Sequence, residues 1–208
     1  MSDRLDGVLD AAAALLRRVD EVLTASGAPP DHDVWPTLRR VRLLPWDAVN
    51  AVAALRPAEL TEAAPELRAD AQACAAVAEA LPPPGGWSGT AADAYDDARK
   101  RTAGHLSGSG ESLDVRLTAT ADLADALVAW MTEARAGLAA TLAEVLTSTE
   151  ALTLSPHAAP GAVDLASEAE AEAAADVAAK VLQAIADTYD AATDLMSASA
   201  DLTTVRWS

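Results

Sequence analysis

Phenylalanine is absent from this sequence, and two tyrosines and five tryptophans are its only aromatic residues. The single cysteine, Cys74, excludes an intramolecular disulfide and a cysteine-ligated metal cluster. No run of about 18 uncharged apolar residues is present, so we expect no transmembrane helix. The first residues, MSDRLDGVLDAAAALLRRVDE, carry acids where a signal peptide has a basic segment, and we expect no cleaved signal peptide.

Basic residues are also scarce. Lysine and arginine together number 15 against 32 aspartates and glutamates, a net charge of −17. Residues 1–56 are close to neutral, with seven basic and eight acidic residues, and the rest of the chain carries the excess. This charge disfavours binding to nucleic acid or to an anionic membrane. Two interpretations remain, namely a solvated helix face or a docking surface for a basic partner.

Alanine dominates the 51% of residues that are apolar. Because alanine is the best helix former and contributes little hydrophobic free energy, the composition predicts an all-α protein of close-packed helices. Apolar residues recur every three or four positions over residues 3–25, which predicts an amphipathic helix. The stripe comprises Leu5, Leu9, Ala12, Leu15, Leu16, Val19 and Leu23.

Prolines and tryptophans then interrupt the chain between Val34 and Pro57. Pro36 and Pro45 divide this segment, and Pro45 suits the first turn of a short helix that runs to about Leu55. From Pro57 on, Leu60, Leu67, Cys74 and Leu81 are spaced by seven, which predicts a heptad-like helix.

The remaining pattern predicts two further long helices. One begins near Thr90 and reaches about Leu152, with a kink or break in the glycine-rich stretch 104–111. A linker at 155–162 precedes a last acidic helix over 163–202. The sequence therefore predicts an N-terminal segment at 1–56, a central helical hairpin at 57–154 and a C-terminal segment at 155–208, together forming one compact domain.

The chain contains no recognisable catalytic constellation. The histidines His32, His105 and His157 lie in segments flanked by proline or glycine, and none has a second ligand at helical spacing. Asp96 and Asp97 are adjacent, so they lie on different faces of a helix. We therefore expect no catalytic residues, no metal and no cofactor, and we interpret the protein as a non-enzyme.

The stretch PPPGGWSGTAADAY, Pro82 to Tyr95, combines a chain reversal with an aromatic residue. Gly85 and Gly86 supply the backbone freedom for the turn. Ser88 or Thr90 is expected to cap the following helix. Tyr95 lies about two helical turns beyond Trp87, so both rings are expected on one flank of the hairpin, where Trp87 either covers the end of the helix pair or projects as an anchor for another protein.

The residues Trp87, Ser88 and Gly89, followed by Ala91, Ala92, Ala94 and Tyr95, make this region similar to the WXG family of helical-hairpin proteins exported by type VII (ESX) secretion systems of Gram-positive bacteria, especially actinobacteria. The resemblance covers about residues 58–150. It implies a non-catalytic protein that acts by protein–protein interaction, as a secreted substrate or an accessory partner. It also implies a protein partner, either another WXG-like protein or a secretion-system component, and export without a cleaved signal peptide from the cytoplasm.

Two features depart from the family pattern. The chain is about twice the usual family length, and we expect its added helices to cover the hairpin in a four- to five-helix bundle, which favours a monomer over a homodimer. The family's export signal places an acid four residues after a tyrosine, whereas Tyr189 has Thr193 there, with Asp190 and Asp194 on either side. We interpret these residues as an imperfect export signal.

A second interpretation is a cytoplasmic helical adaptor or chaperone unrelated to export. Its partner surface is then expected in the basic, aromatic part of the N-terminal segment, at Trp35, Arg39, Arg40, Arg42 and Trp46.

Overall fold

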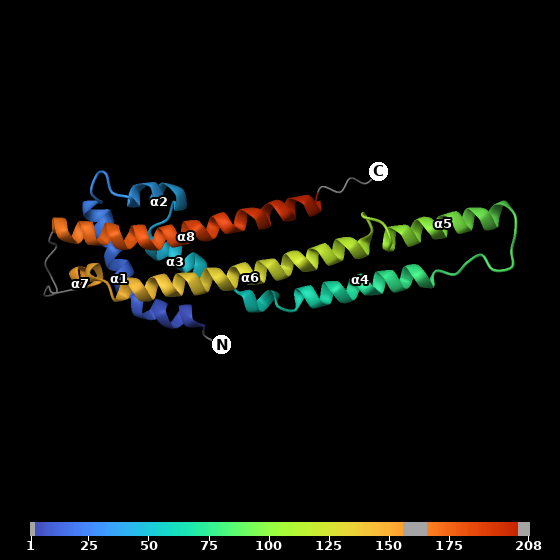
Figure 1. Ribbon diagram of the computed structural model, residues 1–208, viewed down its shortest axis with the longest axis horizontal. Coiled ribbons are helices and arrows are strands. Elements are labelled where there is room, and N and C mark those ends of the chain that lie inside the picture. The colour runs from blue at the N-terminus through green and yellow to red at the C-terminus, as the bar shows by residue number, and fades with distance from the viewer. Residues whose placement is uncertain (1–2, 156–165, 204–208) are drawn as a thin grey trace. The chain divides into compact units, whose positions relative to one another are not determined.

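The computed structural model describes residues 3–155 and 166–203. Every regular element in these two ranges is a helix, and they contain no strand, which confirms the all-α prediction. The chain divides into two compact units. Unit 1 combines Met1–Leu55 with Trp130–Thr193, and unit 2 combines Arg56–Ala129 with Asp194–Ser208. Two long helices, α6 and α8, each contribute to both units (Figure 1).

Unit 1 is built from α1 to α3, the second part of α6, α7 and most of α8. Unit 2 is built from a 3-10 turn η1, α4, α5, the first part of α6 and the end of α8. The bounds are α1 Arg4–Ser26, α2 Val34–Val41, α3 Pro45–Ala53, η1 Pro57–Leu60, α4 Ala63–Ala80, α5 Thr90–Leu106, α6 Leu113–Leu146, α7 Thr149–Leu154 and α8 Glu168–Thr203.

Helix α1 is capped at both ends. The Asp3 carboxylate accepts hydrogen bonds from the N–H groups of Leu5 and Asp6, while the Asp6 carboxylate accepts from the Asp3 N–H, and together they form a capping box. Gly27 ends the helix with a φ of 72°, a conformation that glycine adopts without steric cost. The N–H of Gly27 donates to the Leu23 carbonyl. These caps fix where the apolar stripe of α1 starts and stops.

That predicted stripe is confirmed at four of its positions, since Leu5, Ala12, Leu16 and Val19 are at most 1% exposed. The other three predicted residues are partly buried against the same core. They are Leu9, Leu15 and Leu23.

The two prolines of the following segment both lie in the first turn of a helix. Pro45 is the first residue of α3, as predicted. Pro36 does not divide the segment, because it lies in the first turn of α2, where its missing N–H removes no intrahelical hydrogen bond. Helix α3 ends at Ala53, two residues before the predicted end. Further on, Arg56 has non-helical backbone, with φ −125° and ψ 73°, as the following Pro57 favours.

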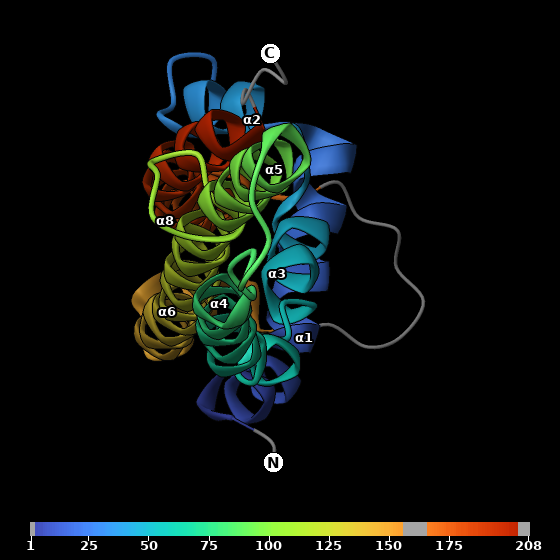
Figure 2. The same cartoon turned by 90° about the vertical axis from the view of Figure 1, so that its right-hand side faces the viewer.

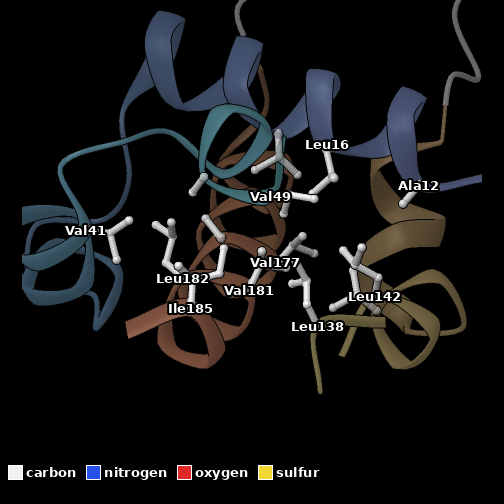
Figure 3. Packing of buried hydrophobic residues seen from close by; sticks show 14 of the residues in the cluster. Ala12, Leu16, Val41, Val49, Leu138, Leu142, Val177, Val181, Leu182 and Ile185 are labelled. Carbon is white, nitrogen blue, oxygen red and sulfur yellow. The ribbon is translucent and has the colours of Figure 1, made fainter. Parts of the chain in front are cut away.

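The core of unit 1 lies where α1, α2, α3, α6 and α8 meet. Their large apolar side chains point toward one another, as Figure 3 shows for Leu16, Val49, Leu142, Val181 and Ile185. Helix α3 lies along α1 (Figure 2). Fully buried alanines on α6 and α8 shorten the distance at which these helices pack. They include Ala139, Ala174, Ala178 and Ala186.

A buried arginine on α6 joins this core to the start of the chain. The Arg135 side chain is 6% exposed, and its guanidinium donates from Nε to the Asp3 carboxylate at 2.5 Å and from a terminal nitrogen to the Asp6 carboxylate at 2.8 Å. The other terminal nitrogen donates to the carbonyls of Ala53 and Leu55 at 2.5 and 3.1 Å. Arg135 therefore holds the first turn of α1 and the end of α3 at once.

Unit 2 buries far fewer large side chains than unit 1 does. Helix α4 lies beside α5 and runs in the opposite direction, and α5 and α6 follow each other along one line (Figure 1). Among its described residues only small side chains are buried, while the large residues Val77, Leu113 and Val115 are 53%, 41% and 43% exposed. The buried residues are Ala64, Ala71, Ala92, Ser112 and Ala121.

The predicted break in the second long helix is confirmed, because α5 ends at Leu106 and α6 begins at Leu113. The Asp114 carboxylate organises the connection by accepting hydrogen bonds from the hydroxyls of Ser107 and Ser112, each at 2.5 Å. These two hydroxyls lower the pKa of Asp114 below its usual value. The glycine- and serine-rich stretch is therefore an ordered turn between two helices.

We predict that Arg135→Met destabilises the protein by about 3 kcal/mol, because it removes a buried cation that donates to two carboxylates and two backbone carbonyls. Urea unfolding followed by circular dichroism measures this. The matched surface change Arg101→Met should cost less than about 0.5 kcal/mol. The hydrogen bonds from Arg135 lower the pKa of Asp3 and of Asp6. The stabilisation that Asp3 and Asp6 provide through Arg135 is therefore complete above pH ~4, and it is lost as the pH falls through their lowered pKa values. Equal stability of the two variants at pH 7 would contradict the prediction.

Candidate interaction site

The turn between α4 and α5 occupies residues 81–89. Two of its glycines have positive φ, 67° at Gly85 and 96° at Gly89. The backbone freedom predicted for Gly85 is therefore used, and Gly89 rather than Gly86 supplies the second left-handed position. These two glycines allow the chain to reverse within a few residues.

The structure brings Trp87 and Tyr95 together on this turn, as their spacing predicts. Their rings stack with centroids 5.3 Å apart and planes inclined by 30°. The Tyr95 hydroxyl donates to the Pro82 carbonyl at 2.9 Å, which ties the second turn of α5 to the residues that follow α4. Trp87 is 56% exposed. Tyr95 therefore supports one face of an indole ring that remains largely open to solvent.

The predicted helix cap at Ser88 or Thr90 is wrong. Helix α5 starts at Thr90 with Gly89 as its N-cap residue, and no side chain accepts from its first N–H groups. Gly89, with φ 96° and ψ −178°, is the last non-helical residue before α5. Ser88, Gly89 and Thr90 are all exposed, so water solvates these amides in place of a hydroxyl.

One turn further along α5, an ion-pair cluster follows the aromatic pair. Asp96 contacts Lys100 and Arg99, each at 2.8 Å, and these hydrogen bonds lower the pKa of Asp96, with Lys100 the larger cause. This carboxylate is thus paired within its own helix. No group of three or more potential metal ligands occurs in the described part of the chain.

The basic, aromatic segment around α2 and α3 is partly packed into unit 1. The Trp35 ring nitrogen donates to the Pro29 carbonyl at 2.7 Å, and the ring packs against the core. Trp46 also packs against the core, beneath the guanidinium of Arg17 at 4.6 Å from the ring centroid. The exposed residues of the segment include three arginines and Leu43. These arginines are Arg39, Arg40 and Arg42.

One contact joins this segment to the predicted export-signal residues. Arg40 forms an ion pair with Asp190, which raises the pKa of the Arg40 guanidinium. Tyr189, the preceding residue, is 40% exposed, and Asp194 lies exposed one turn later on the same helix. Asp190 is therefore engaged by α2, whereas the tyrosine faces solvent.

Two side chains of unit 1 make long-range contacts that sequence patterns do not reveal. Arg135 falls within the apolar phase of α6, between Met131 and Leu138, and a charged residue in that phase was the available signal. Asp20, on α1, accepts a hydrogen bond from the backbone N–H of Trp46 at 3.4 Å and so caps α3 from outside the helix. Such a long-range cap has no local sequence signature.

Partial burial raises the pKa of Asp20 to about 6. The hydrogen bond from the Trp46 N–H lowers this pKa, and the negative charge of nearby Asp47 raises it further. The folded protein therefore holds this proton more tightly than the unfolded chain does. Above pH ~6 Asp20 is ionised in the folded protein, and its full cost is subtracted from the free energy of unfolding. This cost disappears as the pH falls toward ~4.

Asp20→Asn keeps an oxygen acceptor for Trp46 and removes the charge. We expect it to stabilise the protein at pH 7.5 by about 1 kcal/mol, a value discounted for the solvent that reaches Asp20. The gain should shrink toward zero near pH 4, as urea unfolding across this pH range would show. Asp10→Asn, an exposed change on the same helix, is the control. A gain that does not depend on pH would refute the assignment.

Within the described residues no helix has both the length and the apolar character needed to cross a bilayer. Comparisons with protein-family models, with curated proteins and with solved structures found no match.

The exposure of Trp87 predicts that Trp87→Ala changes the free energy of unfolding by less than about 1 kcal/mol, the contribution of one exposed aromatic pair. Trp46→Ala, which removes a ring packed against the core, should cost about 3 kcal/mol. Urea unfolding compares the two. A loss of similar size in both variants would mean that Trp87 is a packing residue.

Proposed function

We propose that this protein is a non-catalytic helical protein of a type VII (ESX) secretion pathway, acting by protein–protein interaction as a secreted substrate or an accessory partner. The observation that carries the proposal is the Trp87–Tyr95 stack on the turn between α4 and α5. A tryptophan that is 56% exposed and stacked on a neighbouring ring suits an interface anchor, because aromatic residues are enriched in binding hot spots. The residues of this turn are also those that resemble the WXG motif.

The small buried side chains of unit 2 support a second contact with a partner, along the helices. In this proposal α4, α5 and the first part of α6 form a WXG-like hairpin, and its buried positions hold only alanines and one serine. Its leucines and valines remain partly or largely exposed, so their hydrophobic contribution is incomplete until another surface covers them.

The partner is best supplied by a different protein. A second copy also carries a net charge of −17, and repulsion between two such chains opposes self-association. We therefore propose a monomer that binds another WXG-like protein or a secretion-system component. It is secreted without a cleaved signal peptide and resides in the cytoplasm before export.

The test is export from an actinobacterial host, with and without the ATPase of its type VII system. We expect the protein in the culture supernatant of the active strain alone, and at least tenfold less of the Trp87→Ala variant. Glu133→Ala, an exposed change on the part of α6 that belongs to unit 1, is the control and should leave export unchanged. Tyr189→Ala tests the imperfect export signal in the same assay.

Retention of the unaltered protein in both strains would exclude the secreted-substrate role. In that case copurification with WXG-like proteins separates the remaining possibilities. Binding that depends on Trp87 supports an accessory partner. Binding only to unrelated proteins supports a cytoplasmic adaptor or chaperone.

A further inference from the structure

A groove of about 310 Å³ lies on unit 1 between α1 and α7. Its lining is mostly aliphatic, and one charged side chain stands at its edge. The residues that matter for its chemistry are Ala11, Ala14, Leu15, Arg18, Leu146 and Leu152.

Helix α7 holds Leu152 outward beside this groove. Ser148 caps the helix by accepting from the Ala151 N–H at 3.2 Å, and Ala151 and Leu154 are buried, 7% and 2% exposed. With these residues fixed inward, Leu152 is 68% exposed. A leucine gains about 1.5–3 kcal/mol on full burial, so Leu152 and the groove together form an apolar surface that the described residues leave uncovered.

The α1 wall of the groove has room for a second helix. Ala11 and Ala14 are exposed, and their methyl groups are the only side-chain atoms at these positions. The distance between two packed helices is set by the side chains at their contact, and small ones permit the closest approach.

Charge identifies what the groove accommodates. Arg4, Ala11 and Arg18 are spaced by seven residues, so they lie in one stripe along α1, with the arginines about 10 Å before and after Ala11. Arg18 pairs with Glu170 at 2.9 Å and Glu21 at 3.7 Å. Arg4 is exposed and forms no ion pair with the described residues. In a chain of net charge −17, this stripe places an arginine on each side of an apolar centre, and Arg4 is the one without a carboxylate partner among the described residues.

We propose that the α1–α7 groove is a docking site for a helix of another protein that carries a large apolar residue at its centre and carboxylates about two turns to either side. The apolar residue enters the groove against Leu152, and the carboxylates reach Arg4 and Arg18. A second copy of this chain is disfavoured by the same net charge that opposes dimerisation through unit 2. This site is separate from the Trp87 turn and does not depend on the export proposal.

The test uses three labelled, alanine-based helical peptides of 17 residues and fluorescence anisotropy with the full-length protein. The first has two central leucines with glutamates seven positions before and after them. The second replaces the glutamates by lysines, and the third replaces the leucines by alanines. We expect the first peptide to bind at least tenfold more tightly than either of the others, with hydrogen-exchange protection confined to residues 11–18 and 146–155.

Variants of the protein locate the site. Leu152→Glu and Arg4→Glu should each weaken binding of the first peptide at least tenfold. Met196→Glu, at a residue of α8 that is 73% exposed, should leave it unchanged. Because Leu152 is exposed, the circular dichroism spectrum of Leu152→Glu should match that of the unaltered protein.

Three results would each overturn the proposal. The first is equal affinity for the glutamate and lysine peptides, and the second is binding that Leu152→Glu does not weaken. The third is self-association in sedimentation velocity that Leu152→Glu abolishes, because it would assign the groove to a second copy. None of these results depends on whether the protein is exported.

Discussion

The pairing of the buried Arg135 guanidinium is the interaction on which unit 1 depends. A buried guanidinium needs partners for its N–H donors, and here two carboxylates from the first turn of α1 and two carbonyls from the end of α3 accept four hydrogen bonds from it. Asp3 and Asp6 already form the capping box of α1, so the same carboxylates start the helix and position it against α6. The register of α1 on the core, and with it the α1 wall of the groove beside α7, follows from this set of contacts.

Burial differs sharply between the two units. In unit 1, leucines, valines and an isoleucine are fully buried. In unit 2, alanines and a serine take the buried positions, and the large apolar residues remain partly exposed. Alanine favours helices strongly but contributes little hydrophobic free energy, so an alanine-rich helix pair forms readily and stays incompletely covered. In the proposed function, the exposed Trp87 ring adds a specific anchor to this apolar surface.

Local patterns predicted most of the fold. The stripe on α1, the start of α3 at Pro45 and the break before Leu113 all depend on residues within a few positions of one another, which periodicity and proline or glycine chemistry describe well. The cap of α5 was predicted wrongly, because Gly89 in a left-handed conformation takes the N-cap position that a hydroxyl usually holds. Arg135 and Asp20 were missed because their partners lie 26 to 132 residues away along the chain, and no local pattern encodes such contacts. Trp87 and Tyr95 were predicted on one flank and do stack, but Trp87 precedes the first residue of α5, so the turn places its ring rather than a helical spacing.

The contacts of Arg135 also govern the order in which the chain is able to fold during synthesis. Unit 1 is discontinuous, since its first part ends at Leu55 and its second begins at Trp130. The ribosome therefore completes all of α4 and α5 before Arg135 exists to receive Asp3 and Asp6, and α8 follows later still. Contacts between such distant segments carry a loop-closure cost and form slowly, whereas the local helices of the intervening segment form early. The nascent protein consequently presents the Trp87 turn before its main core has closed.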